Sequence, residues 1–527
     1  MATTTTKNGS TWNTIHFNGP YPTKILYSTA LAPDRPLRGK INRYNDAAKE
    51  IQRLLKETLD ANEGFRAFGA RWSLSNIAHH KDRMHFNENM NIKISITDND
   101  MHAGSGFKSD DLFFLQCGNK IKEISEFIIR EGKSLKTSGA SNGQTIGGAV
   151  STGVHGSALG VGSVQDFVVG INLIIGPNPT DIVYLERKSQ PALSDAFAAS
   201  IHARVVRDDK LFNAALVGLG SFGFIHGVVI EAEDLYLLNR YVRKVDKSVA
   251  MELATTMNFK ESDFKITGET DASGKPSEPY HYKIFINPYN NNADYVVEIM
   301  YKKPFRENYP DPIPRIQTAL YKDLILLFNK IAANHKNSIP KLIKLLQGDI
   351  LPKVDEDTIG TLGEIFDDAI NQGPAFACSV GVDHKDAKKT LDLLVDLARN
   401  EGPVPGIYGM RFVKASKATL AFTKFPVTCM LEMDGVLWQG NNKIISLEEF
   451  SKRMIEVLID AGIEFTIHWG KNAAWSFPDL IEKMYGPNAD DWKTQRAKLL
   501  SPEAARLFSN EFLKVTQLAD VHAGVFA

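Results

Sequence analysis

Residues 137–160 read TSGASNGQTIGGAVSTGVHGSALG, and this stretch decides the fold. Glycine is mixed here with small hydroxyl and amide side chains and almost no charge, a composition that brings bare backbone N–H groups close to a large anionic ligand. A flexible glycine-serine linker is the alternative interpretation. The irregular glycine spacing, and the recurrence of Ile146, Val150 and Val154 at helical intervals, instead indicate a structured binding loop.

The composition is that of a soluble globular protein with two domains. The chain has 527 residues, too many for one core, of which 43% are hydrophobic and 23% charged. Its formal net charge is −1, so no overall field attracts nucleic acid or an anionic membrane. Cys117, Cys378 and Cys429 lie far apart, which predicts reduced core residues with no disulfide framework and no metal site.

The sequence gives no indication of secretion at its N-terminus and none of a membrane-spanning stretch. The N-terminus lacks a basic region followed by an apolar one, and no stretch approaches about 18 consecutive apolar residues. We therefore expect a cytoplasmic protein without a transmembrane segment. The apolar run LILLF at 324–328 favours a buried helix, with an interfacial helix that touches membranes as the alternative.

Helix, strand and loop alternate along the first part of the chain. Residues 45–62 place Ala48, Ile51, Leu55 and Leu59 on one helical face. Strand patterns follow at 90–96, 112–118, 166–176, 181–187 and 225–238. This alternation predicts an α+β or α/β fold.

The pattern changes after about residue 238. Residues 280–304 read as a hairpin of long strands around an Asn-rich turn, and helices are expected around 320–331 and 339–346. From 375 onward, strand and helix patterns predict an antiparallel sheet covered by helices on one face. Such a sheet is a good substrate-binding cap.

Three separated glycine-rich elements need one explanation: residues 68–76 (FGARWSLSN), 137–160 and 215–233 (ALVGLGSFGFIHGVVIEAE). None matches GxGxxG followed by a helix and a distant acid, and none contains GxxxxGK[ST]. Dinucleotide binding of the Rossmann type and P-loop nucleotide hydrolysis are therefore disfavoured.

Together the three elements resemble the FAD-binding domain of the vanillyl-alcohol oxidase superfamily, also called the PCMH-type flavin domain. QTIGGAVSTGVHG at 144–156 and GLGSFGFIHGVV at 218–229 carry most of the resemblance, which is good over roughly 1–235 and looser over 400–475. It implies a two-subdomain FAD-binding domain at 1–238, a cap domain at 239–465 and a C-terminal segment at 466–527 that lines the active site. The FAD contacts that it implies are Gly69, Ala70, Arg71, Trp72, Ser73, Gly139, Asn142, Gly143, Thr145, Gly147, Gly148, Ser151, Thr152, Gly153, His155, Gly156, Gly223, Ile225 and Val228.

The sequence departs from the family pattern where the flavin is usually attached. Many members carry a His bonded to the flavin where this chain has Trp72, and some add a Cys link at the position of Gly143. Neither residue here can form such a bond, so we expect dissociable FAD. Arg71 replaces a usual Gly and could add a charge-assisted contact to the pyrophosphate. His155 is interpreted as a ring that hydrogen-bonds the tight loop rather than as a reacting group.

The first catalytic candidates lie in IHWGKN at 467–472, which resembles the HWGK segment of the sugar-lactone and alditol oxidase branch. In that branch the segment lies near the isoalloxazine. A cation such as Lys471 would stabilise the negative charge that reduced flavin gains. The alternative is a surface lysine after a strand.

The second set lies in GMRFVKAS at 409–416, which resembles the E-x-R-F strand of that branch and of flavin-linked sterol oxidases. Arg411 matches the family arginine that faces the substrate, but the Glu position is Gly409. Arg411 either polarises a substrate oxygen or pairs across the sheet with Glu432. His468 and Glu432 are the candidate catalytic bases.

The resemblance implies an FAD-dependent oxidoreductase that removes hydride from an alcohol carbon to flavin N5. The expected substrates are polyols, sugars, aldonolactones or sterols, and O₂ or another acceptor would reoxidise the flavin, as an oxidase or a dehydrogenase respectively. Peripheral membrane contact is expected only for a lipidic substrate. The alternatives are an NAD(P)H-dependent reductase like the enolpyruvyl-sugar reductases, and a non-catalytic binding protein with the same fold.

Overall fold

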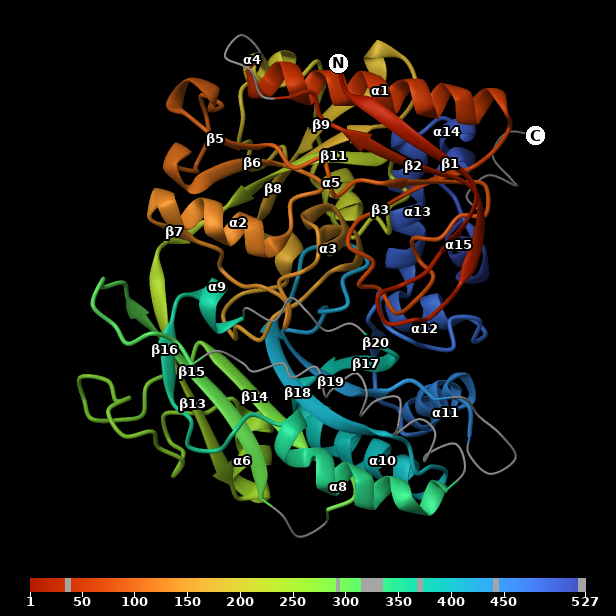
Figure 1. Cartoon of the computed structure of the whole chain (residues 1–527). Helices are drawn as coiled ribbons and strands as arrows, with labels where there is room; N and C mark the ends of the chain where they lie inside the picture. Colours follow the sequence, from red (N-terminus) through yellow and green to blue (C-terminus); the bar gives the residue numbers. More distant parts are fainter. Residues whose placement is uncertain (34–38, 291–293, 314–334, 367–372, 439–444, 520–527) are drawn as a thin grey trace.

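The computed structural model describes residues 1–33, 39–290, 294–313, 335–366, 373–438 and 445–519. Figure 1 shows two halves, an upper one built from β1 to β11 with α1 to α5, and a lower one built around β13 to β19. The helix expected at 320–331, including LILLF, lies outside the described residues.

Two sheets organise the upper half. The first has the order β1 (Thr3–Trp12), β2 (Tyr21–Ala30), β4 (Arg83–Phe86) and β3 (Phe65–Phe68). The second has the order β10 (Arg204–Arg207), β9 (Ile182–Glu186), β8 (Val168–Ile174), β11 (Phe224–Glu231), β6 (Leu112–Gln116) and β5 (Lys93–Ser95). Both sheets mix parallel and antiparallel pairs. In the first, β2–β4 is parallel and β1–β2 antiparallel, and in the second, β10–β9 is parallel and β8–β9 antiparallel. The sequence interpretation did not assign β1 and β2.

One eight-stranded sheet organises the lower half. Its order is β16 (Thr358–Gly360), β13 (Tyr236–Val245), β15 (Tyr295–Pro304), β14 (His281–Ile286), β18 (Gly406–Lys414), β19 (Val427–Val436), β17 (Ala375–Asp383) and β20 (Thr466–Ile467). Every described pair is antiparallel, which confirms the predicted antiparallel sheet. A small pair, β7 (Lys133–Ser134) with β12 (Glu233–Asp234), lies between the halves.

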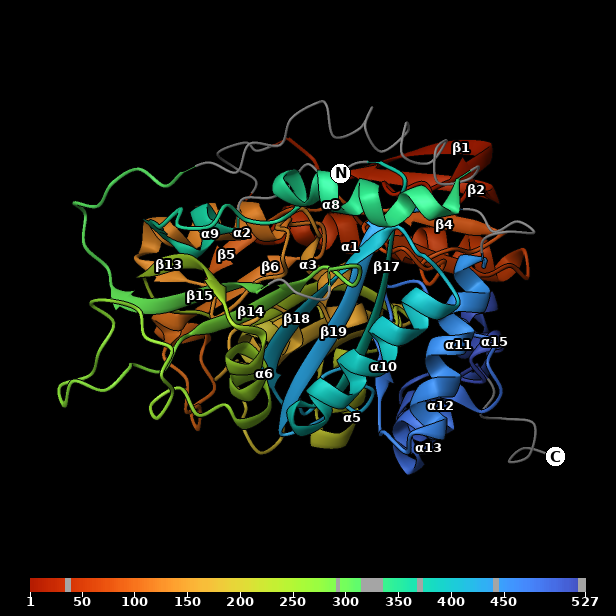
Figure 2. The same ribbon diagram turned by 90° about the horizontal axis from the view of Figure 1, so that it is seen from below.

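The sheet of the lower half has one face against helices and one face toward the upper half (Figure 2). Tyr282 and Tyr408 donate hydrogen bonds to the carbonyls of Ala250 on α6 (Lys247–Thr256) and Leu394 on α10 (Ala387–Asn400). Because strand side chains alternate, the neighbouring residues of β14 and β18 point to the opposite face. That face carries the candidate catalytic residues.

The remaining helices cover the two halves and fill the C-terminal part. In the upper half these are α1 (Lys40–Asp60), α2 (Ile121–Ile128), α3 (Ile146–Thr152), α4 (Asp195–Ser200) and α5 (Asp209–Leu216), and in the lower half α8 (Ile339–Ile350), α9 (Leu362–Ile365) and α11 (Leu447–Asp460). The C-terminal part holds α12 (Leu480–Tyr485), α13 (Pro487–Leu499), α14 (Pro502–Leu507) and α15 (Glu511–Val515). α13 packs on α5, where Trp492 donates to the Val217 carbonyl at 3.2 Å.

One predicted strand is wrong. Residues 225–238 are not continuous, because β11 ends at Glu231 and β13 begins at Tyr236 in the other sheet. The Ala232 N–H instead bonds the Asp111 carbonyl at 2.7 Å, and Glu233 pairs with Ser134. A run of β-favouring residues does not reveal that the chain passes from one sheet to another.

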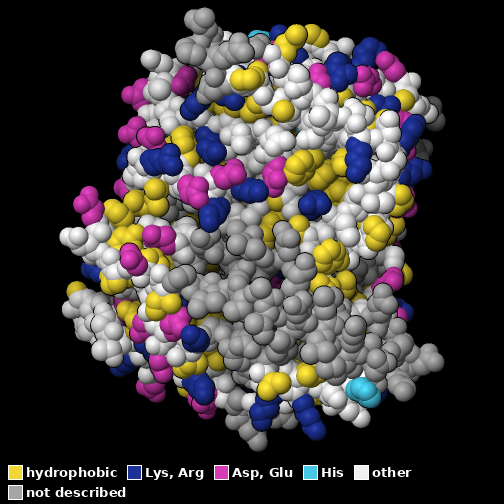
Figure 3. All heavy atoms as spheres, in the orientation of Figure 1, with side chains coloured by type: hydrophobic (Ala, Val, Ile, Leu, Met, Phe, Trp, Pro, Cys, Tyr) yellow, Lys and Arg dark blue, Asp and Glu magenta, His cyan; other side chains and the backbone are white. Residues whose placement is uncertain are grey.

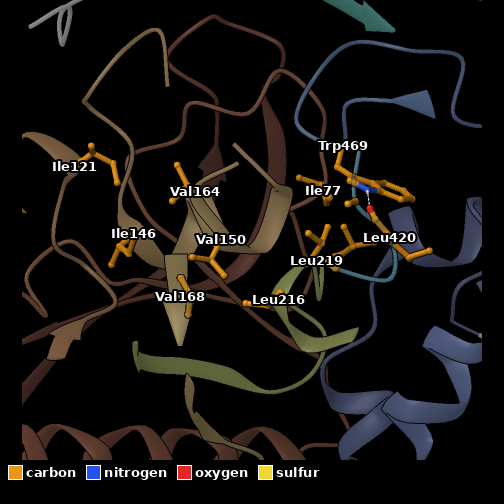
Figure 4. Packing of buried hydrophobic residues seen from close by; sticks show 14 of the residues in the cluster. Ile77, Ile121, Ile146, Val150, Val164, Val168, Leu216, Leu219, Leu420 and Trp469 are labelled. Carbon is orange, nitrogen blue, oxygen red and sulfur yellow. Dashed lines mark hydrogen bonds between the residues drawn. The ribbon is translucent and has the colours of Figure 1, made fainter. Parts of the chain in front are cut away.

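The glycine-rich stretch is anchored by its apolar residues. Ile146 and Val150 lie on α3 and are fully buried, and Figure 4 shows them in one cluster with Val164, Val168 and Leu216. This anchoring confirms a structured loop in place of a flexible linker. It holds the glycine backbone at a fixed place beside the lower sheet.

The buried position of the three cysteines agrees with the sequence expectation. Cys117, Cys378 and Cys429 are free and buried. Figure 3 shows basic and acidic side chains interspersed over the described part of one face. Among the described helices, none is long and apolar enough to span a bilayer, and the described residues hold no group that could bind a metal ion.

Candidate active site

A cavity of about 1190 Å³ lies between the glycine-rich elements and the lower sheet. All three glycine-rich elements line it from above, and Arg411, Glu432, His468 and Lys471 line it from below. Pockets for a single ligand typically have about 300–1,000 Å³. The volume therefore leaves room for a cofactor and a second molecule.

Most of the predicted cofactor contacts line this cavity. They are Gly69, Ala70, Arg71, Trp72, Ser73, Gly139, Thr145, Gly147, Gly148, Ser151, Thr152, His155, Gly223 and Ile225. The other five do not: Asn142, Gly143, Gly153, Gly156 and Val228. Val228 lies inside the sheet between β6 and β8, and Gly153 ends α3 in the left-handed region at φ 68°.

The three glycine-rich elements form a cradle above the cavity, which presents backbone atoms and buried polar atoms without hydrogen-bond partners among the described residues. A Cβ at Gly69 would lie 1.9 Å from Thr145 Oγ1, so the first two glycine-rich elements touch at this point. Thr145 Oγ1 and Gln144 Oε1 are buried and have no hydrogen-bond partner among the described residues. Buried polar atoms of this kind normally have a partner. The cradle therefore fits a polar ligand such as FAD, whose phosphate oxygens could accept from Thr145 Oγ1 and whose ring N–H and hydroxyl groups could donate to Gln144 Oε1.

Trp72 packs directly on Gly143. A Cβ at Gly143 would lie 2.5 Å from Trp72 Cζ2, so a larger residue at 143 and the indole cannot share this place. The edge of Trp72 also meets the His16 ring, with centroids 5.7 Å apart. The two positions that carry flavin links in related proteins thus form one packed contact here.

Two buried arginines support the third glycine-rich element. Arg66 donates to the carbonyls of Phe508, Ile77 and Leu219, while Arg496 on α13 donates to the Ser221 carbonyl at 3.0 Å. Burial lowers the pKa of Arg66 to about 9 and that of Arg496 to about 10. Arg496 was missed by the sequence interpretation, because no local signal links it to a turn 275 residues earlier.

Below the cavity, Arg411 and Glu432 form a buried ion pair across β18 and β19. Arg411 Nε donates to Glu432 Oε2 at 2.6 Å, and Nη2 contacts the same oxygen. The structure confirms the cross-sheet pairing that the sequence left open, while both side chains also line the cavity. The second oxygen, Glu432 Oε1, is buried without a hydrogen-bond partner in the described part of the chain.

Charges around Glu432 hold it ionised. Lys471 Nζ lies 3.8 Å and His155 Nε2 3.7 Å from Glu432 Oε1. Burial alone would raise the pKa of Glu432, but Arg411, then Lys471, outweigh it and hold this pKa well below its usual range. Glu432 is therefore a carboxylate with one oxygen that makes no hydrogen bond among the described residues.

The two histidines beside Glu432 are neutral. Burial lowers the pKa of His155 to about 3, and burial lowers the pKa of His468 well below its usual value. His155 Nδ1 donates to the Gly156 carbonyl at 3.1 Å, as expected for a ring that bonds its own loop. His468 Nδ1 accepts the Gly470 N–H at 3.0 Å, so its proton is on Nε2. His468 is thus a hydrogen-bond donor at Nε2 and not a ready base.

A second charged group lines the same sheet face. Lys283 Nζ donates to Glu298 Oε2 at 2.7 Å, and Arg240 Nε contacts Glu298 Oε1. All three side chains are buried and line the cavity. Sequence reasoning missed them, although a lysine and a glutamate inside the apolar strands at 281–286 and 295–304 were a usable signal.

Comparisons with known proteins agree with the resemblance drawn from the motifs. No family model matches the chain. The chain is 36% identical over 121 residues to L-gulonolactone oxidase 3 of Arabidopsis thaliana, which covers 23% of this chain and 18% of the relative. It is 32% identical over 120 residues to a long-chain alcohol oxidase of an uncultured marine euryarchaeote, covering 23% of this chain and 21% of the relative.

Solved structures extend the likeness to the whole fold. A solvent-stable cholesterol oxidase has a TM-score of 0.68 at 13% identity, over 97% of both chains. Cholesterol oxidase from B. sterolicum has a TM-score of 0.64 at 14% identity, over 96% of both chains. At such identities the likeness shows the fold alone.

The fold and the matched segments confirm the resemblance to the vanillyl-alcohol oxidase superfamily. The relatives are named as lactone oxidases and a long-chain alcohol oxidase, and the structural neighbours are cholesterol oxidases. The matches span about a fifth of the length of the first curated relatives.

Proposed function

We propose that this protein is an FAD-dependent oxidoreductase that oxidises a CH–OH donor such as a polyol, sugar, aldonolactone or sterol. One observation carries the proposal. A single cavity is lined by the three glycine-rich elements on one side and by Arg411, Glu432, His468 and Lys471 on the other. The relatives are named as lactone and alcohol oxidases, which supports the same reaction class.

FAD binding is assigned to the glycine-rich side of the cavity, with residues 1–238 as its domain and 239–465 as the cap. Gly69, Thr145, Gly148 and Gly223 line that side, and the unpaired Thr145 Oγ1 is available to a ligand. Bound FAD supplies the acceptor for the hydride of the alcohol carbon. Because Trp72 and Gly143 occupy the attachment positions, the cofactor is held without a covalent bond.

The residues below the cavity bind and polarise the alcohol. Glu432 Oε1 accepts the hydrogen bond of the substrate hydroxyl, which satisfies the buried acceptor. Arg411 and Lys471 stabilise the negative charge that develops on the hydroxyl oxygen as its proton moves to Glu432. His468 Nε2–H is a further donor at the cavity wall. In this arrangement Glu432 is the acceptor that faces the hydroxyl, and His468 cannot take the proton because its one unprotonated nitrogen already accepts the Gly470 N–H.

Reduction of the bound flavin tests this function. The purified yellow protein is mixed anaerobically with polyols, aldonolactones and sterols, and with NADPH alone, while its flavin absorbance is followed. Bleaching by at least one alcohol, and not by NADPH, is the expected result. Rapid bleaching by NADPH alone would establish a flavin reductase. A protein that binds no flavin would be a non-catalytic relative of the fold.

A further inference from the structure

Gly409 leaves an open place in the eight-stranded sheet of the lower half, directly beside Glu432. In the pairing of β18 with its neighbours, Gly409 lies opposite Glu432 on β19 and opposite Phe285 on β14. Directly opposite residues point to the same face of a sheet. Phe285, Gly409 and Glu432 accordingly line the same cavity.

Packing does not require a glycine at this position. A Cβ at Gly409 would meet no atom within 4 Å, and its backbone is not in the left-handed region. Other glycines of this sheet differ, since a Cβ at Gly406 would lie 2.9 Å from Phe376 and one at Gly435 2.1 Å from the Pro405 carbonyl. A glycine inside a strand weakens it, and one without a packing reason marks a place where a ligand approaches the backbone.

The surroundings of this place are polar on one side and apolar on the other. Glu432 Oε1 is a buried acceptor without a hydrogen-bond partner in the described structure, and Lys471 Nζ lies 3.8 Å from it. On the opposite side lies Phe285, Ile407 precedes Gly409 by two residues on β18, and the cavity wall continues with Ile343 and Leu351. A molecule over Gly409 therefore meets a carboxylate at one edge and hydrocarbon at the other.

The bare backbone around Gly409 forms a broad floor to the cavity. Adjacent strands lie about 4.8 Å apart, so the strands that carry Phe285 and Glu432 are roughly 10 Å apart with bare backbone between them. An unbranched chain leaves part of such a floor uncovered, whereas a ring lying flat on the backbone covers it. Burial of apolar area favours the ligand that covers more of the floor.

Building on the function proposed above, we propose that Gly409 is the specificity-determining residue for a cyclic alcohol. The hydroxyl-bearing ring lies on the Gly409 backbone, its hydroxyl donates to Glu432, and its apolar skeleton extends toward Phe285 and Ile407. The substrate class is therefore a cyclic secondary alcohol with an apolar body, in preference to an acyclic polyol.

Binding of product analogues tests this assignment without turnover. The probes are a 3-keto-steroid and an acyclic methyl ketone of equal carbon number, and the readout is the perturbation of the bound flavin spectrum in wild type, Gly409→Ala and Gly409→Val. Because the added Cβ meets no protein atom, both variants are expected to keep FAD and the melting temperature of the wild type. Gly106→Ala, at an exposed glycine outside the cavity with equally open space, is the matched control.

The expected result is tighter binding of the cyclic ketone to wild type, a loss of about 10-fold or more in Gly409→Ala, and a larger loss in Gly409→Val. The acyclic ketone and the control variant should change by less than about 3-fold. Equal effects on both ketones, or no effect on the cyclic one, would overturn the role of Gly409. Failure of the proposed function is read separately, as the absence of bleaching of wild type by any alcohol.

Discussion

Replacement of Glu432 by glutamine should damage stability and activity together. The change keeps the shape of the side chain and removes its charge. Arg411 and Lys471 then remain at the cavity wall without their shared carboxylate, whose oxygens lie 2.6 Å from Arg411 Nε and 3.8 Å from Lys471 Nζ. Opposite charges about 4 Å apart interact by about 4 kcal/mol at an effective dielectric constant of 20. Two cations attract the carboxylate, and part of the combined attraction is offset because the carboxylate no longer has to be desolvated, so we expect a net loss of about 3–5 kcal/mol.

The assay pairs each measurement with a control from the same network. Asp434→Asn also removes a carboxylate near Lys471, at 3.9 Å, but its side chain is 56% exposed and should contribute less than about 1 kcal/mol. The double variant Glu432→Gln with Arg411→Met should recover part of the lost stability, because it removes both charges of the pair. Thermal unfolding of the FAD-bound protein gives the comparison.

Activity gives the second readout of the same variants. If Glu432 accepts the hydroxyl proton, Glu432→Gln should lower the rate of anaerobic flavin reduction by about 10²–10⁴-fold. FAD binding should be unchanged, because the glycine-rich cradle lies on the other side of the cavity. A variant as stable and active as Asp434→Asn would refute the ionised, paired carboxylate and its role as base.

Three further predictions follow from the buried contacts. Acid precipitation should release all of the FAD into the supernatant, and flavin retained in the pellet would contradict non-covalent binding. Gly143→Val, which displaces the Trp72 indole, should weaken FAD binding by about 5–150-fold as judged by ultrafiltration. Burial lowers the pKa of His85 to about 3. Below about pH 6.5 the unfolded chain therefore takes up a proton that the folded chain does not, and the free energy of unfolding should fall as the pH decreases. In melting experiments, His85→Gln should recover about 2 kcal/mol at pH 5 relative to pH 8. Arg496→Met should cost about 1–3 kcal/mol, while the exposed Lys498→Met should cost less than about 1 kcal/mol; equal melting temperatures would rule out the support of the third glycine-rich element.

Local patterns were sufficient for the cradle and for much of the lower sheet. Ile146 and Val150 recur at helical spacing, and they are the residues that bury α3 in the core. The pairing of Arg411 with Glu432 was one of two alternatives that the sequence left open, and the structure shows the pair on neighbouring antiparallel strands. The spacing of apolar residues along a helix or strand follows from its local backbone geometry, so it can be recognised in the sequence.

Long-range contacts were not available from the pattern. The switch of the chain between two sheets at Ala232, and the support of Ser221 by Arg496, depend on packing between distant segments. Asn142 and Val228 were assigned to the cofactor by position in a motif, but both are buried and neither lines the cavity. A motif fixes the order of residues and not which way each one points.

A single-turnover experiment directly tests the proposal that the bound flavin oxidises an alcohol whose hydroxyl donates to Glu432. The FAD-bound protein is mixed under anaerobic conditions with an excess of a cyclic secondary alcohol, and the carbonyl product is quantified against the flavin that is bleached. We expect one carbonyl per flavin, and no bleaching when the alcohol is replaced by its methyl ether, which cannot donate a hydrogen bond to Glu432. Bleaching by NADPH in the absence of alcohol, with no carbonyl formed from any alcohol, would contradict it.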